Sequence, residues 1–198
     1  MSSSRGDQPG LRERKKARTR AAIQDHALRL FIEQGYENTT VEQIAAAAEV
    51  SQSTFFRYFP TKEDTIAYDR LDPIAMRAFL DQPPDLPPIT ALRTALRQMR
   101  ASLRAEESEL ESARQRLIMT VPELRMRLMD QITAGMDLLN HAVAERTGRS
   151  PGDPAVRTWS GVVVGVVLAA FLETSDEPGR FIQAFDEGLA RLEAGLPL

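Results

Sequence analysis

The sequence predicts an all-α protein of about nine helices, in which a small three-helix domain precedes a larger helical bundle. Three observations support this fold class. Apolar residues recur at helical spacing along most of the chain, helix-capping patterns precede several of these segments, and strand-like patterns are absent outside residues 162–167. That exception belongs to a longer apolar segment, which favours a buried helix. We predict a flexible tail at residues 1–10, the small domain at 11–60 and the bundle at 61–198.

The composition allows a substantial core and places positive charge at one end. The chain has 198 residues, of which 42% are hydrophobic. It has no cysteine, which excludes disulfides, thiolate metal sites and a cysteine nucleophile. The net charge of −3 is unevenly distributed: residues 1–62 carry ten basic and seven acidic side chains, whereas residues 63–198 carry fifteen basic and twenty-one acidic ones. This asymmetry indicates that a polyanion binds at the first domain only.

The sequence predicts a cytoplasmic protein that does not enter a membrane. Residues 1–10 are polar and lack the apolar segment of a secretory signal. The longest apolar run, at residues 162–172, is shorter than the roughly 20 residues that a helix needs to cross a bilayer.

The first predicted helix begins with a basic segment and ends with a buried face. Ile23, Ala27 and Phe31 have helical spacing, and Gly35 is a suitable C-cap. The basic side chains of its first half are Arg12, Arg14, Lys15, Lys16, Arg18 and Arg20. A basic segment by itself is usually only a solvated helix face. If a nucleic-acid-binding element lies next to it in the chain, contacts of these side chains with phosphates become the better interpretation.

The next two predicted helices are short and have clear start signals. Thr40 and Gln43 have the spacing of a capping box, and Ser51 is a second N-cap. Pro60 ends the helix that follows Ser51. Its second half is aromatic, and some of these side chains must pack against the preceding helix: Phe55, Phe56, Tyr58 and Phe59.

Two short helices joined by a tight turn, the second polar at its start, are typical of a helix-turn-helix that reads the DNA major groove. Gln52, Ser53 and Thr54 lie in the first turn of the second helix and can hydrogen-bond to base edges. Lys62 lies at the start of the next predicted helix, where backbone N–H groups also favour an anion. The residues predicted to hold DNA phosphates are Arg18, Thr40, Tyr58 and Lys62.

The segment from Phe31 to Asp64 reads F-I-E-Q-G-Y-E-N-T-T-V-E-Q-I-A-A-A-A-E-V-S-Q-S-T-F-F-R-Y-F-P-T-K-E-D. In this run the sequence resembles the TetR-type bacterial transcription regulators. The resemblance implies an all-helical homodimer that binds a palindromic operator in double-stranded DNA. It also implies a variable C-terminal domain that binds a small-molecule effector and controls the pair of DNA-binding domains.

Two positions depart from the family pattern. Glu49 occupies a turn position that usually carries glycine, and a left-handed backbone there would cost glutamate up to about 1 kcal/mol. Phe56 stands where the family often has a tyrosine that commonly contacts a phosphate. Phenylalanine cannot donate that hydrogen bond, whereas Tyr58 retains its hydroxyl.

The remaining chain is predicted to be helical at about residues 61–80, 89–106, 108–119, 122–147, 153–174 and 177–194. Pro73 lies inside the first of these helices and predicts a kink or a break. The segment 82–88 contains four prolines and predicts a stiff connector between helices. A polyproline ligand for another protein is the less favoured alternative.

Methionine and aromatic residues on the bundle helices are candidates for an effector pocket, because methionine adapts to irregular cavities. Plain core packing is the more common explanation for such a set, so both interpretations stay open. The candidate pocket residues are Met76, Phe79, Met99, Leu103, Met119, Met126, Met129 and Trp159. Polar side chains that could fix a ligand are Arg100, Gln131, Asn140 and His141.

A second, shorter resemblance concerns the bundle. Residues 114–127 carry the pattern R-x-x-L-I-x-x-x-P-E-L-R, which is similar to the regulatory domain of a TetR subgroup that includes mycofactocin-system regulators. This resemblance implies acyl-CoA thioesters as the effectors.

The helix predicted at residues 153–174 is apolar on nearly all its faces, and such a helix must be buried on all of them. Gly161, Gly165 and Ala169 form a strip of small residues that lets another helix approach closely. Packing within the chain is one interpretation, whereas the TetR resemblance implies a four-helix bundle between two subunits. The candidate interface residues are Gly161, Gly165, Leu168, Phe181, Phe185 and Leu189.

The sequence therefore predicts a sequence-specific transcriptional regulator, most simply a repressor that a small apolar ligand such as a fatty acyl-CoA releases from its operator. A ligand-independent or activating DNA-binding protein is the alternative. An architectural DNA-binding protein would need far more positive charge. The sequence contains no phosphate-binding loop, paired histidines or nucleophile motif, so we expect no enzyme activity, cofactor or metal site.

Overall fold

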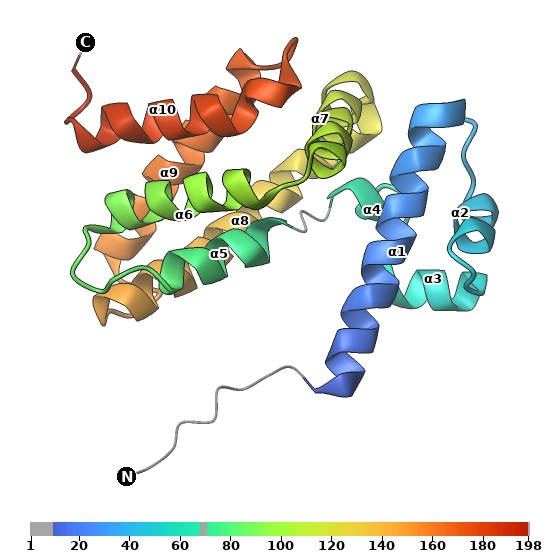
Figure 1. The fold of residues 1–198 in the computed structure, drawn as a ribbon, viewed down its shortest axis with the longest axis horizontal. Helices are drawn as coiled ribbons and strands as arrows, with labels where there is room; N and C mark the ends of the chain where they lie inside the picture. Colours follow the sequence, from blue (N-terminus) through green and yellow to red (C-terminus); the bar gives the residue numbers. More distant parts are fainter. Residues whose placement is uncertain (1–9, 68–70, 198) are drawn as a thin grey trace. The chain divides into compact units, whose positions relative to one another are not determined.

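The computed structural model describes residues 10–67 and 71–197, and all regular structure within them is helical, as predicted (Figure 1). The predicted tail at residues 1–10 lies outside the described residues except for Gly10. The elements are α1 (Leu11–Gln34), α2 (Val41–Ala47), α3 (Gln52–Tyr58), α4 (Asp64–Ala67), α5 (Leu71–Leu80), α6 (Pro88–Ser102), α7 (Ala105–Thr120), α8 (Pro122–Thr147), α9 (Pro154–Glu173), the 3-10 helix η1 (Pro178–Arg180) and α10 (Phe181–Glu193).

The described residues contain ten α-helices rather than nine, because two helices occupy the region where one was expected. The helix predicted at residues 61–80 is represented by α4 and α5, and residues 68–70 between them lie outside the described part. Pro73 is the third residue of α5 as the structure describes it, and the residues directly before α5, where the predicted kink or break would lie, are outside the described part.

The chain divides into two compact units, and the division falls after Ile66 rather than after Pro60. The reason is that residues 61–66 pack with the first three helices. Thr65 and Ile66 are buried, and the amide of Gln24 on α1 donates a hydrogen bond of 3.0 Å to the carbonyl oxygen of Thr65. The start of α4 therefore belongs to the helix-turn-helix unit.

The first unit forms as its local sequence signals predict. The C-cap of α1 is Gly35, whose φ of +87° is a conformation that glycine adopts without strain. Thr40 and Gln43 make a reciprocal capping box at the start of α2: the Gln43 N–H donates to the Thr40 hydroxyl at 3.3 Å, and Gln43 Oε1 accepts from the Thr40 N–H at 2.9 Å. The fully or almost fully buried side chains of this unit are Ile23, Ala27, Phe31, Ile44, Phe55, Phe59 and Ile66.

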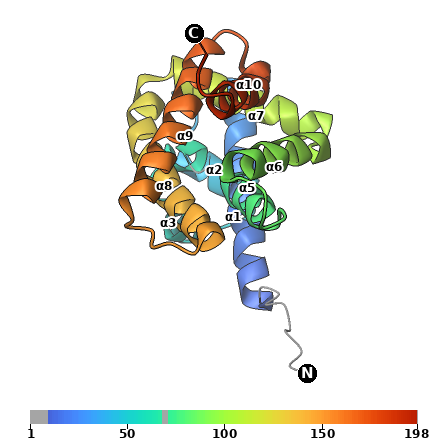
Figure 2. The ribbon, with the colours of Figure 1, turned by 90° about the vertical axis from the view of Figure 1, so that its left-hand side faces the viewer.

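The second unit is a bundle with a continuous core. In Figure 1, α6 lies between α5 and α10 and packs against both. Figure 2 shows α8 and α9 side by side, and α9 also packs against α10. The apolar face of α6 buries Ala91, Leu92, Ala95, Leu96 and Met99. This helix ends at Ser102 rather than at about residue 106 as predicted, and Leu103 takes an extended C-cap conformation.

Arg146 near the end of α8 holds the proline-rich connector in place. Its guanidinium donates hydrogen bonds to the carbonyl oxygens of Gln82 and Leu86, each at 3.0 Å, and to that of Pro83. It also lies 5.4 Å from the centre of the Phe79 ring, within the range of a cation–π contact. The carbonyl groups of this segment are therefore used inside the bundle, which fits a connector rather than a peptide ligand.

Gly188 on α10 lies directly against Val166 of α9. A Cβ atom at Gly188 would be 2.4 Å from Val166 Cγ1, which is far inside van der Waals contact. By contrast, Cβ atoms at Gly161 and Gly165 would meet open space within the protomer. Close helix packing inside the protomer therefore uses Gly188, which the sequence patterns did not single out.

An ion-pair network joins α6 to α10. Asp186 accepts hydrogen bonds from Arg93 Nε at 3.0 Å and from Arg97 Nη2 at 2.9 Å, and Glu193 accepts from Arg93 and Thr90. Burial alone would raise the pKa of Asp186, but the hydrogen bonds from Arg97 and Arg93 outweigh it and hold the pKa below its ordinary value. Hydrogen bonds from Thr90 and Arg93 similarly lower the pKa of Glu193.

This network predicts acid-sensitive packing of α10. Because both carboxyl groups have lower pKa values folded than unfolded, their stabilising effect is complete above the unfolded values and is lost as the pH falls from about 4 downward. An Asp186→Asn variant should unfold more easily at pH 7, by about 1.5–3 kcal/mol. It should also lose less stability than the wild type between pH 5 and pH 3. Urea unfolding across this pH range measures both effects, and parallel pH curves for the two proteins would contradict the assignment.

Candidate functional site

Helix α3 has exposed polar side chains in its first turn and buried phenylalanine rings in its second half. The hydroxyl oxygen of Ser51 caps the helix by accepting a hydrogen bond of 3.1 Å from the Thr54 N–H. Phe55 and Phe59 are fully buried, with ring centres 6.0 Å apart, and anchor the helix to its unit. Gln52 is exposed in the first turn. Phe55 and Phe59 thus fix the helix, whereas Gln52 and Ser53 face solvent.

The three residues predicted to contact base edges differ in their exposure and in their hydrogen bonds within the protein. The hydroxyl of Ser51 lies 2.9 Å from that of Ser53 and donates to that of Thr54 at 3.0 Å. Ser53 is exposed, whereas Thr54 is half-buried. Thr54 therefore contributes largely to the cap, and Gln52 is the best placed of the three to reach a base edge.

The turn between α2 and α3 contains a strained residue. Glu49 has a φ of +54°, in the left-handed region that favours glycine. The family departure noted at this position therefore has a structural cost, because the Cβ atom of a non-glycine residue crowds the backbone there.

A Glu49→Gly variant is expected to stabilise the first unit by about 0.5–1 kcal/mol, because it removes this crowding at the expense of a more flexible unfolded chain. The measurement is thermal unfolding followed by circular dichroism. Glu42→Gly, inside α2, is the matched control and should destabilise instead, because glycine costs about 1 kcal/mol within a helix. A fall in stability for Glu49→Gly would show that the turn relaxes in solution.

The basic half of α1 is exposed except at its end. Arg12, Arg14, Lys15, Lys16 and Arg18 are all exposed, so Arg18 is available for a phosphate. The guanidinium of Arg20 instead lies 4.9 Å from the centre of the Phe59 ring, where it ties α1 to the end of α3.

Lys62 has a different environment from the one predicted. Its ammonium donates hydrogen bonds to the carbonyl oxygens of Tyr36 and Thr39 at 2.9 and 3.1 Å, and lies 4.1 Å from the centre of the Tyr36 ring. An ammonium has three donors, so these contacts leave at most one for a phosphate. α4 begins only at Asp64, so Lys62 precedes the helix rather than forming its first turn.

Glu63 completes this local cluster. The Tyr36 hydroxyl donates a hydrogen bond to its carboxylate. Burial alone would raise the pKa of Glu63, but this hydrogen bond and those from its own backbone and Thr61, together with the charge of Lys62, lower it below its ordinary value. The cluster holds the loop between α1 and α2 against the segment before α4.

The other two predicted phosphate contacts lie on accessible parts of the unit. Thr40 is exposed, and its hydroxyl accepts the capping bond from Gln43 while its own proton stays available for a further acceptor. Tyr58 is half-buried, and the guanidinium of Arg57 lies 5.5 Å from its ring centre.

Four of the predicted pocket residues lie in or against the bundle core. Phe79 and Met99 are buried in the bundle core, and Met76 and Trp159 pack against the same core. The Phe79 and Trp159 rings stack with centres 6.4 Å apart. These four residues support the core interpretation that the sequence left open.

The other four predicted pocket residues are scattered. Leu103 caps α6, and Met119 is half-buried near the end of α7. Met126 is 72% exposed, so it lines no enclosed space in this conformation. The Met129 side chain lies outside the described part of the chain.

Three buried side-chain atoms of the bundle have no hydrogen-bond partner among the described residues: Asn140 Oδ1 and Arg146 Nε on α8, and Ser160 Oγ on α9. Asn140 and Ser160 are more than nine-tenths buried. Buried polar groups are normally satisfied by protein, water or ligand. Asn140 is also one of the polar residues that the sequence suggested for fixing a ligand.

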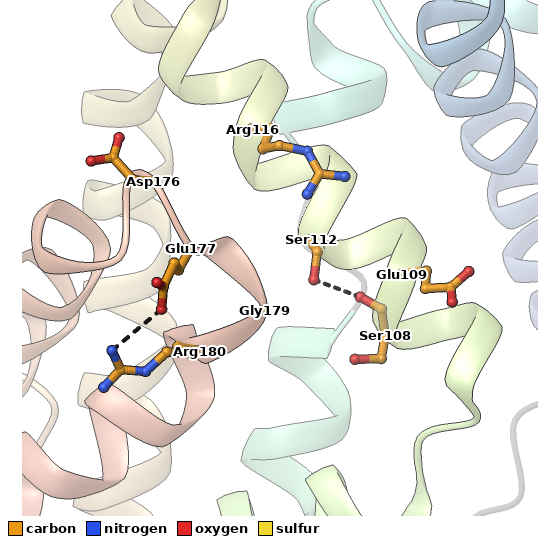
Figure 3. Close-up of a pocket in the computed structure, with 8 residues that line it drawn as sticks. All are labelled: Ser108, Glu109, Ser112, Arg116, Asp176, Glu177, Gly179 and Arg180. Atoms are coloured by element: carbon orange, nitrogen blue, oxygen red, sulfur yellow. Dashed lines mark hydrogen bonds and ion pairs between the residues drawn. The ribbon is translucent and has the colours of Figure 1, made fainter.

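A cavity of about 380 Å³ lies between α7 and η1, away from all the predicted pocket residues (Figure 3). It is open and lined by charged and hydroxyl side chains. Arg180 forms an ion pair of 3.4 Å with Glu177 at one wall, and the Ser112 hydroxyl donates to the Ser108 carbonyl oxygen at the other. This lining suits no apolar effector.

The predicted interface residues fall into two groups. Gly165 and Leu168 on α9 are exposed, and Gly161 and Phe181 are half-buried. Phe185 is buried, and Leu189 is fully enclosed in the core of its own protomer. Leu189 therefore has no surface to offer a partner, because α10 turns this side chain toward α6 and α9.

The exposed face of α9 is apolar along most of its length. Its exposed residues Val162, Gly165, Leu168, Ala169 and Leu172 recur at intervals of three and four and so form one stripe. The prediction that this helix is buried on all sides is thus wrong for the single protomer. Packing against the bundle covers only the side that bears residues such as Val163 and Ala170.

Helix α9 is longer than the apolar run on which the sequence prediction against a membrane span was based. As a 20-residue helix, α9 is long and apolar enough to cross a membrane by length and composition. The helix extends beyond the uninterrupted apolar run of residues 162–172 at both ends. A core or interface helix passes the same test, so this feature is weak evidence for a membrane.

Family models for known proteins match both units. The model described as "Bacterial regulatory proteins, tetR family" matches residues 23–67, and the model "MftR C-terminal domain" matches residues 86–197. The second match covers more than half of the chain.

Individual relatives agree with these matches. The chain is 37% identical to the HTH-type transcriptional regulator TcmR of Streptomyces glaucescens over 147 residues, which span 71% of this chain but only 65% of TcmR. It is 29% identical over 162 residues to MftR of Mycobacterium tuberculosis, assigned as a mycofactocin biosynthesis transcriptional regulator, with 80% of both chains covered.

A solved structure shares the fold. The Thermus thermophilus FadR repressor, crystallised with lauroyl-CoA, superposes with a TM-score of 0.55 at 24% identity, covering 90% of this chain and 95% of FadR. With a helix-turn-helix unit, an MftR-type bundle and regulators rather than enzymes as relatives, the chain belongs to the TetR family of bacterial regulatory proteins.

Proposed function

We propose that the protein is a cytoplasmic transcriptional repressor that binds a palindromic operator as a homodimer. The observation that carries this proposal is the arrangement of side chains on α3. Gln52 and Ser53 are exposed in its first turn, and the buried rings of Phe55 and Phe59 anchor the helix. The exposed basic half of α1, with Arg18, adds charge for DNA phosphates. Direct contacts from one such helix per subunit read the major groove.

The homodimer forms through the apolar stripe of α9, residues Val162, Gly165, Leu168, Ala169 and Leu172. The stripe is exposed in the protomer. Soluble proteins rarely expose a large contiguous apolar patch unless it is an interaction site. Burying it against the same stripe of a second copy gives a closed two-fold dimer, which matches a palindromic operator. Phe181 and Gly161, at the half-buried edge, extend this interface.

The effector is a small apolar molecule, with a fatty acyl-CoA as the specific candidate. The MftR-type bundle and the R-x-x-L-I-x-x-x-P-E-L-R pattern favour this class. FadR shows that the shared fold accommodates a long acyl chain. The unpartnered oxygen atoms of Asn140 and Ser160 offer polar anchors within the bundle.

The effector releases DNA by favouring a dimer whose two reading helices no longer match successive major grooves, about 34–36 Å apart. To reverse a strong preference for the DNA-bound state, it must bind the released state about 10⁴-fold more tightly.

The test starts from DNA that the purified protein retains from its own genome. Sequencing and footprinting should reveal one palindromic protected site. Acyl-CoAs of increasing chain length are then titrated into the complex, with coenzyme A alone as the control. If long-chain acyl-CoAs release the DNA and coenzyme A alone does not, the acyl-CoA proposal is supported. Release by an unrelated compound alone refutes the acyl-CoA class but not the repressor. Broad coating of DNA without a preferred site refutes the repressor itself.

A further inference from the structure

We propose that Phe56 selects thymine at one position of each operator half-site by packing against the C5 methyl group of the base. This inference rests on the proposed DNA-binding function. It deepens that function by naming a base, an atom of that base and the side chain that recognises it.

The exposure of Phe56 is the first observation. Phe56 is 50% exposed, whereas the two neighbouring phenylalanines, Phe55 and Phe59, have no exposed surface. The Phe55 and Phe56 rings meet edge to face, with centres 5.5 Å apart and planes at 88°. One side of Phe56 therefore rests on a fixed core residue, and the other side faces outward in a defined orientation.

The position of Phe56 on α3 is the second observation. Gln52 and Ser53 precede it by four and three residues, so all three side chains share one face of the helix, and all three are exposed. Phe56 lies about one helical turn, or 5.4 Å, beyond Gln52. When Gln52 reaches a base edge, Phe56 is placed to reach a neighbouring base pair in the same groove.

The chemistry of the groove then identifies the partner. A phenyl ring cannot donate a hydrogen bond, so Phe56 cannot hold a phosphate as a tyrosine would. The hydrogen-bonding groups of base edges likewise gain nothing from it. The methyl group of thymine is the one apolar group that a base pair presents in the major groove. Contact with it removes both the ring and the methyl group from water.

The experiment removes that methyl group alone. An operator is selected from a random DNA library, and each thymine is replaced in turn by uracil, which differs only at C5. For the wild type, the substitution at one position of each half-site should weaken binding about fourfold per half-site, the amount expected for one methyl group. For Phe56→Ala the same substitution should have no effect.

Ile32→Ala is the matched control, because Ile32 is also 50% exposed but lies on α1. This variant should keep the full response to uracil, and circular dichroism should show that both variants fold. Wild-type protein that tolerates uracil at every position overturns the proposal. A methyl effect that persists in Phe56→Ala also overturns it, since another residue then reads the methyl group. Failure to select any preferred sequence refutes the proposed function, and this inference falls with it.

Discussion

Gly165→Leu is expected to give a folded monomer that binds the operator about 100-fold or more weakly than the wild-type dimer. Within the protomer, a Cβ atom at Gly165 meets open space, so the fold should accommodate the larger side chain. On the apolar stripe of α9, the same side chain would hold the partner helix away. A monomer loses the second half-site contact, which the dimer makes at high effective concentration. Light scattering and operator titration measure the two effects.

Gly188→Ala is the control that distinguishes a loss of dimerisation from a loss of packing within the protomer. Its added methyl group would collide with Val166 inside the protomer, and valine has little freedom to turn away. We expect a loss of about 1–3 kcal/mol in the free energy of unfolding, with the dimer retained while the protein is folded. A Gly165→Leu protein that remains a stable dimer would place the interface elsewhere.

Gln52→Ala is expected to relax base preference at one position of each half-site, with a loss of about 1–3 kcal/mol for each base contact. The structure supports this expectation for Gln52 more than for Thr54, whose hydroxyl is engaged with the Ser51 cap. Binding to a library randomised at each operator position measures the change in preference.

Arg18→Ala is the companion variant for phosphate binding. It should weaken binding to all sequences alike and lower the salt dependence by about one unit per subunit. Lys62→Ala should behave differently from both, because loss of its bonds to Tyr36 and Thr39 destabilises the unit itself. If Gln52→Ala and Arg18→Ala both reduce affinity uniformly over the library, the division between base-reading and phosphate-holding residues is wrong.

Features that depend on neighbouring residues were predictable from the sequence. The capping box at Thr40 and Gln43, the Ser51 cap and the Gly35 C-cap all occur as predicted, because each uses bonds within four residues. On α6, the buried residues Leu92, Leu96 and Met99 lie on one side of the helix, because residues three and four apart share a helix face. The helix-turn-helix follows from these signals and from the need to bury most of the aromatic residues.

Features that depend on distant contacts required the tertiary structure. Gly165 and Gly188 look alike in the sequence, yet only Gly188 faces another helix of its own protomer. Leu189 has the spacing of an interface residue but is enclosed by the core. Lys62 has the sequence position of a phosphate ligand, but carbonyl groups of residues far along the chain engage its ammonium.

The sequence by itself therefore determined the fold class and the two short helices of the helix-turn-helix, because local hydrogen bonds and apolar spacing encode them, and the segment 31–64 carried the resemblance to the TetR family. Only the tertiary structure decided which side of α9 is left exposed, which glycine lies against another helix and which polar atoms are buried without a partner. These properties depend on how helices that are distant in sequence pack together, and the same apolar pattern is compatible with a core, a pocket or an interface until that packing is known.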